Sequence, residues 1–250
     1  MRKLITFVLI SSILSITSIT AFAQSSASKP YLTINTISQP PFTTKDKDGF
    51  LDLLLAEAFK RVGVSFKIVN LPAERGLIAA NDDIIDGDLP RIKGLSKNYK
   101  NLIMVPEKVR DTDFCALSKN PDISAKPDEL IKHVIGYIKG WKIYDKMMAG
   151  SKRVITADSA KQLFRLLKLN RIDVALYNCI NGIVVSNKMG IQGVKILQPA
   201  FPKGKMYLYL NKKHIKLVPQ ISKALHEIKA EGIYKSLYRK KIMPKLKTKN

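Results

Sequence analysis

Two arginines stand beside acidic residues in positions that suit the binding of an anion. Arg91 follows the acidic turn Asp86-Gly87-Asp88, and Arg75 follows Glu74 in a segment that begins at Pro72. A guanidinium group binds a carboxylate through two parallel hydrogen bonds, so either arginine can hold the acid group of a small molecule. Arg91 is the stronger candidate and Arg75 the weaker one. For each, the alternative is a surface arginine in an ion pair.

The position of Arg91 after a predicted strand supports this choice. The apolar pair Ile84-Ile85 predicts a strand that ends at Asp86 and opens into a polar loop carrying Asp88 and Arg91. In open α/β sheets, ligands bind just beyond the carboxyl ends of the strands. We therefore expect Asp88 and Arg91 at a binding site. We also expect Arg91→Ala to abolish ligand binding while leaving the melting temperature within a few degrees.

Phe42 and Trp141 are the aromatic candidates for the same site. Phe42 lies after the first predicted strand, and Trp141 follows Gly140 at the start of a predicted helix. The free amide groups at a helix start can also take an anion. For both aromatic side chains, the alternative is packing in the core.

Strands and helices alternate along the chain, which is typical of the α/β class. Apolar and β-branched runs predict strands at 31–36, 64–69, 84–85, 102–105, 111–118, 134–138, 153–156, 172–177, 195–197 and 206–210. Helical spacing of apolar residues predicts helices at 49–62, from 72, at 126–132, at 141–149, from 159, and from 215 onward. This order predicts two α/β lobes in tandem, each a mostly parallel sheet with flanking helices. A cleft between two lobes is a common place for a small molecule.

Residues 1–23 have the pattern of a secretory signal peptide. A positive start, an apolar stretch and the small-residue site Ala21-Phe22-Ala23 predict cleavage before Gln24. The alternative is an uncleaved membrane anchor, which needs a longer apolar core of ~18 residues or more. We therefore expect an exported, periplasmic protein.

The histidines and cysteines show no spacing typical of a metal site or a catalytic triad. His133, His214 and His226 lie far apart in the sequence. We therefore predict no cofactor and no metal. In an oxidising compartment, Cys115 and Cys179 either form one disulfide or stay apart as small buried residues.

The net charge of +23 is large and favours an anionic partner. Nucleic acid is one such partner, but the lysines are scattered and no basic motif is interleaved with aromatic residues. The dense basic cluster lies at 239–249, near the end of the sequence. We expect a solvated basic face and no nucleic-acid partner.

Several short motifs follow one another in a characteristic order. They are Pro40-Pro41-Phe42 with 49–54, Asp86-Gly87 with 99–106, the stretch 170–175 (NRIDVA), and 231–234 (EGIY). In this order and behind a signal peptide, they resemble extracellular solute-binding family 3, the periplasmic binding proteins of polar-amino-acid ABC transporters. The resemblance covers nearly all of the chain after the predicted leader.

The resemblance implies a two-lobed periplasmic-binding-protein-like fold of type II. The expected first lobe comprises 24–112 and 200–250, and the expected second lobe comprises 113–199. Hinge strands are expected near 111–117 and 196–201. In this family an arginine clamps the α-carboxylate of the ligand, and an acid in the second lobe holds its α-amino group.

This chain departs from the family pattern at the second-lobe acid. Asn178 stands five residues after Asp173, where the family carries an aspartate. A neutral amide supplies no charge to an ammonium group, so the pattern favours an acid without an ammonium or another polar solute.

The resulting prediction is a non-enzymatic protein that captures a small polar or anionic solute, amino-acid-like or carboxylate, for an inner-membrane ABC permease or a sensor. We expect it to act as a monomer. One alternative is a dehydratase of a prephenate-like acid on the same scaffold, with Glu74 or Asp88 as the general acid. Another is an envelope interaction protein that uses its basic surface.

Overall fold

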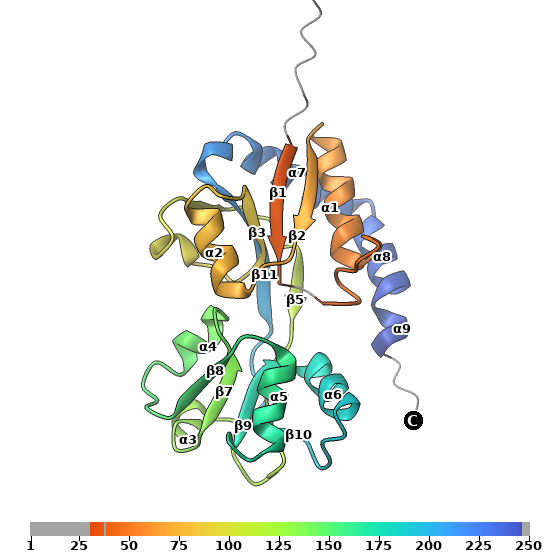
Figure 1. The fold of residues 1–250 in the computed structure, drawn as a ribbon. Coiled ribbons are helices and arrows are strands. Elements are labelled where there is room, and N and C mark those ends of the chain that lie inside the picture. The colour runs from red at the N-terminus through yellow and green to blue at the C-terminus, as the bar shows by residue number, and fades with distance from the viewer. Residues whose placement is uncertain (1–30, 38, 247–250) are drawn as a thin grey trace, which may run out of the picture.

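The computed structural model describes residues 31–37 and 39–246 and contains two β-sheets, each with its own helices (Figure 1). We call the part built on the six-stranded sheet the first lobe and the part built on the five-stranded sheet the second lobe. The predicted signal peptide, 1–23, lies outside the described residues.

The sheet of the first lobe has the strand order β2-β1-β3-β11-β4, and β5 pairs with the far half of β11. Its central strands are parallel, whereas β11 runs antiparallel to its neighbours. The strands are β1 (Tyr31–Thr36), β2 (Ser65–Val69), β3 (Gly87–Arg91), β4 (Leu102–Met104), β5 (Arg110–Thr112) and β11 (Gly204–Asn211).

The sheet of the second lobe has the order β10-β6-β9-β7-β8. Strand β7 is parallel to β8 and β9, and β6 is antiparallel to β9 and β10. The strands are β6 (Phe114–Ser118), β7 (Ile135–Ile138), β8 (Val154–Ala157), β9 (Val174–Asn178) and β10 (Lys195–Ile196).

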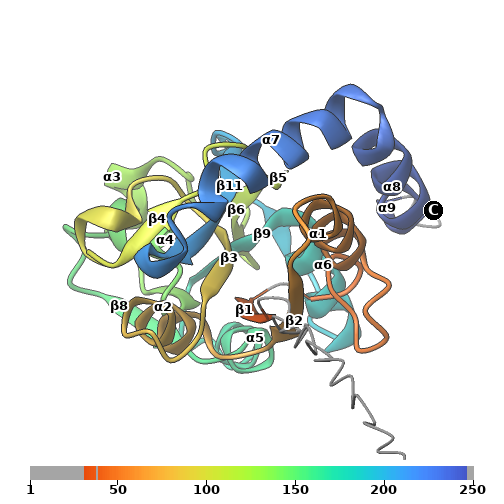
Figure 2. The same cartoon turned by 90° about the horizontal axis from the view of Figure 1, so that it is seen from above.

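The helices pack on the sheets with their apolar faces buried, as α1 (Phe50–Arg61) shows. On α1, the residues at helical spacing are all buried in the core: Leu51, Leu54, Leu55, Ala58 and Phe59. The other helices are α2 (Ala73–Asn81), α3 (Pro127–Leu130), α4 (Lys142–Met147), α5 (Ala160–Lys168), α6 (Cys179–Lys188), α7 (Leu217–Ala230), α8 (Ile233–Lys241) and α9 (Met243–Leu246). Seen from above, α7 leads to α8 beside α1 (Figure 2), where Phe50 meets Tyr234 edge-on.

The strand predicted at Ile84-Ile85 is wrong, because the strand begins two residues later, at Gly87. Ile84 lies in the turn after α2 and is 74% exposed. Asp88 and Arg91, expected in a loop, are inside β3. Asp88 and Arg91 pair with Tyr209 and Tyr207 of β11. The β3 partners are three residues apart and the β11 partners only two, so β3 has a bulge of one extra residue here. Such a bulge re-aims a side chain, and here Arg91 reaches Asp88.

Two segments connect the lobes. One is Asp113, between β5 and β6, and the other is 197–203, between β10 and β11. Asp113 lies within the first segment predicted as a hinge, 111–117, whereas 197–203 overlaps the second, 196–201, and extends two residues beyond it. Within the described residues, no helix is long and apolar enough to cross a membrane, and no cluster of potential metal ligands occurs.

Candidate functional site

A pocket lies between the lobes and takes its lining from both. About 630 Å³ of space in it is free of protein atoms, a volume that includes open solvent. Its walls are mainly apolar. The aromatic lining residues are Phe42, Phe114, Trp141 and Tyr177.

Two polar groups of the pocket are buried without a partner. Arg110 and Thr112 lie two residues apart on β5, and side chains at this spacing point to the same side of a strand. Both line the pocket, while Asp111 between them is exposed. Arg110 is 9% exposed, and neither its Nε nor the Oγ1 of Thr112 has a hydrogen-bond partner.

Arg110 carries a positive charge without a neighbouring carboxylate in contact. None of the ion pairs found among the described residues includes it; its guanidinium instead lies over the ring of Phe42, 4.0 Å from the centroid. Burial lowers the pKa of Arg110 to about 10, which leaves the side chain charged at neutral pH. A buried cation with a free donor is costly unless an anion binds to it.

Trp141 forms an aromatic wall on the side of the second lobe. Its ring stacks on Tyr177 with centroids 4.8 Å apart and planes inclined by 13°. Phe114 meets Trp141 edge-on. The wall presents a flat apolar surface, which suits a planar or apolar part of a ligand. The short helix α4, which Trp141 precedes, has six residues.

Arg91 lines the pocket, but its guanidinium is held by the protein itself. Arg91 is 3% exposed, and its Nε and Nη2 donate to the Oδ2 of Asp88 at 3.0 and 2.5 Å. Nη2 also donates to the carbonyl oxygen of Ala73. Asp88 is fully buried, accepts from Asn35 and does not line the pocket. Burial raises the pKa of Asp88, while Arg91 and Asn35 act in the opposite direction. The ligand-binding role of this pair stays a prediction.

Arg75 and Glu74 lie on α2, and neither lines the pocket. Arg75 is exposed. Glu74 forms an ion pair across the two lobes, accepting from the Nζ of Lys142 at 2.6 Å, and it also accepts from the hydroxyl of Tyr99. Burial tends to raise the pKa of Glu74, but the hydrogen bonds from Lys142 and Tyr99 outweigh it and lower the pKa.

The two lobes also touch at Gly140. A Cβ atom added at Gly140 would lie 2.4 Å from the backbone nitrogen of Glu74, and its φ of +84° favours glycine. The Nη1 of Arg91 donates to the carbonyl oxygen of Gly140 at 3.5 Å. The two lobes are therefore in direct contact on the side where α2 of the first lobe meets the start of α4 in the second. Figure 1 shows α2 directly above α4.

Asn178 lines the pocket, and both ends of its amide are used within the protein. Its Oδ1 accepts from the backbone nitrogen of Asn181, capping α6, and its Nδ2 donates to the carbonyl oxygen of Asp113. Asn178 therefore ties the second lobe to the connecting residue between β5 and β6.

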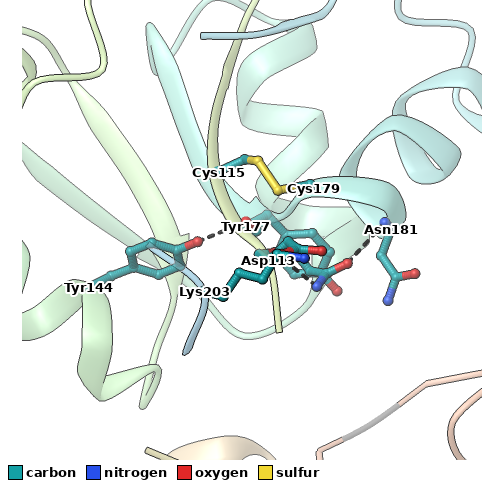
Figure 3. The surroundings of a disulfide bond; sticks show 8 residues. Asp113, Cys115, Tyr144, Tyr177, Cys179, Asn181 and Lys203 are labelled. Atoms are coloured by element: carbon teal, nitrogen blue, oxygen red, sulfur yellow. Dashed lines mark hydrogen bonds and ion pairs between the residues drawn. A yellow bond between two sulfur atoms is a disulfide. The ribbon is translucent and has the colours of Figure 1, made fainter. Parts of the chain in front are cut away.

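A disulfide fixes the same region. Cys115 on β6 and Cys179, the first residue of α6, are bonded, with Cα atoms 5.0 Å apart. Figure 3 shows the bond beside Tyr177, whose carbonyl oxygen accepts from the hydroxyl of Tyr144. Of the two alternatives that the sequence left open for the cysteines, the structure has the disulfide.

The structure brings four of the residues predicted from the sequence to one pocket: Phe42, Arg91, Trp141 and Asn178. Arg110, Thr112 and Tyr177 also line this pocket and were not among the predicted site residues. The predicted extended segment began at 111, one residue after Arg110. The sequence did contain a signal for Arg110 and Thr112. Arg110, Thr112 and Phe114 alternate with Asp111 and Asp113, and this spacing places the first three on one side of an extended chain.

Comparisons with known proteins agree on the fold. No family model matches the chain. A protein of Shewanella oneidensis, itself uncharacterized, is 24% identical over 233 residues, covering 85% of this chain and 86% of its own. The ligand-binding core of GluR0 from Nostoc punctiforme, solved with L-glutamate, matches with a TM-score of 0.70 and 18% identity over 84% of this chain and 99% of its own.

Two further solved structures are similar to this chain. The arginine-, lysine-, histidine-binding protein ArtJ from Geobacillus stearothermophilus has a TM-score of 0.71 and 14% identity, covering 85% of this chain and 95% of its own. A histidine kinase sensor domain with similarity to periplasmic binding proteins has a TM-score of 0.74 and 11% identity, over 86% and 97%. The chain therefore has the two-lobed periplasmic-binding-protein-like fold of type II that the sequence predicted.

Proposed function

We propose that this protein is an exported solute-binding protein of the family 3 type, which captures a small carboxylate-bearing solute between its lobes without chemical turnover. The bound solute is passed to an inner-membrane ABC permease or presented to a sensor. The protein acts in the periplasm as a monomer, and its lobes follow the predicted boundaries at 112–113 and 199–200.

The observation that carries this proposal is the unpaired, buried guanidinium of Arg110. Its Nε and the hydroxyl of Thr112 are buried in an apolar interlobe pocket without partners. A carboxylate placed there would satisfy both groups and neutralise the charge. A hydrogen bond between charged groups contributes more than a neutral one, by roughly a factor of two.

The similar solved structures support the same reading at a coarser level. One is a ligand-binding core with bound glutamate, another is an amino-acid-binding protein, and a third is a sensor domain. The dehydratase alternative has less support, because neither Glu74 nor Asp88 lines the pocket. Each instead has a charged partner in the protein.

The test is a thermal-shift screen of residues 24–250 against amino acids, mono- and dicarboxylates, keto acids, sugars and oligopeptides, at low and high salt. A ligand at a hundredfold excess over its dissociation constant stabilises the folded form by about 2.7 kcal/mol. We expect shifts confined to carboxylates. Arg110→Gln should abolish them, whereas Arg171→Gln, at an exposed arginine, should leave them unchanged.

Two outcomes would contradict the proposal. One is a screen without any shift, combined with salt-reversible adhesion of the protein to an anionic polymer, which would favour the basic surface. The other is a carboxylate shift that persists undiminished in Arg110→Gln.

A further inference from the structure

The pocket between the lobes is lined by cations but by no carboxylate among the described residues. The lining cations are Arg91, Arg110 and Lys142. Arg91 is paired with Asp88, and Lys142 is paired with Glu74 and Asp145, so their charges are balanced from outside the pocket. Arg110 remains as the cation to be balanced by a ligand. The electrostatics thus favour a ligand with a single negative charge.

A neighbouring groove, which shares Arg110 with the pocket, does contain acids, but each is already paired with a lysine. Asp48 pairs with Lys241 at 2.8 Å and Asp111 with Lys108 at 2.7 Å. Asp113 lies 3.5 Å from the Nζ of Lys203. An ammonium group on the ligand would have to compete with these lysines for a carboxylate.

Asn178 offers no substitute for an acid. Its oxygen caps α6 and its nitrogen bonds to the carbonyl of Asp113, so the amide has a structural task on both sides. A buried ammonium group is costly unless a charged partner compensates it, and a neutral acceptor compensates only in part. The pocket therefore selects against a ligand with an α-ammonium group.

The shape of the pocket indicates what the rest of the ligand is. Trp141 stacked on Tyr177 forms one wall from the second lobe, and Phe42 lines the pocket from the first lobe with its ring against Arg110. Aromatic rings prefer offset-stacked or edge-to-face contacts with other rings. A planar apolar group fits these walls better than a flexible polar chain.

We infer that the ligand is an aromatic monocarboxylate without an ammonium group, with its carboxylate on Arg110 and Thr112 and its ring against Trp141. This inference rests on the proposed function. It assigns specificity to three features: the unpaired Arg110, the aromatic wall and the neutral Asn178. Arg110 selects the acid, Trp141 selects the ring, and Asn178 leaves an ammonium group unpaired.

The experiment uses isothermal titration with four probes that differ in one group each. They are 3-phenylpropanoate, L-phenylalanine, 3-phenylpropanamide and hexanoate. L-Phenylalanine adds the ammonium group, the amide removes the charge, and hexanoate replaces the ring by an alkyl chain. We expect 3-phenylpropanoate to bind at least tenfold more tightly than each of the other three, and Trp141→Ala to remove its advantage over hexanoate.

Asn178→Asp tests the ammonium selection directly. Aspartate also caps a helix, so the variant should fold although it loses the hydrogen bond from Nδ2 to the carbonyl oxygen of Asp113. Its charge should raise the affinity for L-phenylalanine relative to 3-phenylpropanoate by at least tenfold. Asn187→Asp adds the same charge at an exposed position of α6 that does not line the pocket, and it should leave the ratio unchanged.

The outcomes separate this inference from the proposed function. The inference fails and the proposed function stands if L-phenylalanine binds as tightly as 3-phenylpropanoate. The same holds if hexanoate binds as tightly as 3-phenylpropanoate and Arg110→Gln abolishes its binding. If none of the four probes binds and the wider carboxylate screen also shows no shift, both fail.

Discussion

The guanidinium of Arg110 lies 4.0 Å from the centre of the Phe42 ring, and no carboxylate pairs with it among the described residues. The ring covers one face of the cation but supplies no hydrogen-bond acceptor to its Nε. A cation–π contact of this kind contributes about 0.5 to 2 kcal/mol, which is less than the cost of burying an unpaired charge. We therefore expect Arg110 to weaken the empty protein and to prepare it for an anion.

Arg110→Met should make the empty protein more stable while removing ligand binding. The variant keeps much of the side-chain volume and removes the buried charge, so we expect the free energy of unfolding to rise by about 1 to 2 kcal/mol. Urea denaturation with and without a carboxylate from the screen measures both effects. A less stable apo variant would show that the cation is already satisfied in the folded protein.

Arg91→Ala should lower the stability, in contrast to the expectation from sequence. The substitution leaves Asp88 fully buried without its cation, and breaking a buried pair in this way costs about 3 to 5 kcal/mol. The double variant Asp88→Leu/Arg91→Met removes both charges and should recover most of the loss. Urea denaturation measures the unfolding free energy of both variants. An unchanged unfolding free energy in Arg91→Ala would instead support the expectation from sequence that this substitution leaves the stability intact.

Gly140→Ala should weaken ligand binding by holding the lobes apart. The new Cβ would meet the backbone of Glu74 and Ala73 in the closed arrangement. Gly94→Ala is the matched control, because Gly94 also has a positive φ, of +93°, but open space around it. Both variants pay the backbone strain. Only Gly140→Ala should lose affinity for the ligand, by about tenfold or more, which corresponds to about 1.4 kcal/mol. Titration calorimetry measures the affinity of both variants. Equal losses in both would mean that closure is not involved.

The ion pair between Glu74 and Lys142 should give the stability a pH dependence on the acid side. The folded protein lowers the pKa of Glu74 below its usual 4.5, so the pair stabilises the fold above this value and its contribution is lost as the pH falls through the lowered pKa. Because both side chains are partly exposed, we expect about 0.5 to 1 kcal/mol.

Comparing the unfolding free energy of wild type and Glu74→Gln between pH 7 and pH 3 measures this term. The difference should be present at pH 7 and shrink toward pH 3. Glu129→Gln, which removes an exposed pair with Lys132, is the control and should show almost no difference at any pH. A difference between wild type and Glu74→Gln that does not change with pH would contradict the assignment.

The sequence by itself determined the order of elements and the fold class. Apolar periodicity located α1 and β1, because an amphipathic helix and a buried strand must each place apolar side chains at a fixed spacing. It also brought forward Phe42 and Trp141, because each stands next to the end of a predicted element, and Asn178, because the family resemblance places an aspartate at that position. These properties are local, so a single stretch of sequence contains them.

Only the tertiary structure decided which arginine remains unpaired. Arg91 and Arg110 look alike in sequence, each near an aspartate, yet the extra residue in β3 brings Arg91 to Asp88, whereas the alternation of β5 turns Arg110 away from Asp111. The pairing of a charge depends on which groups the fold brings within about 4 Å, and a sequence specifies that distance only through the whole packed chain.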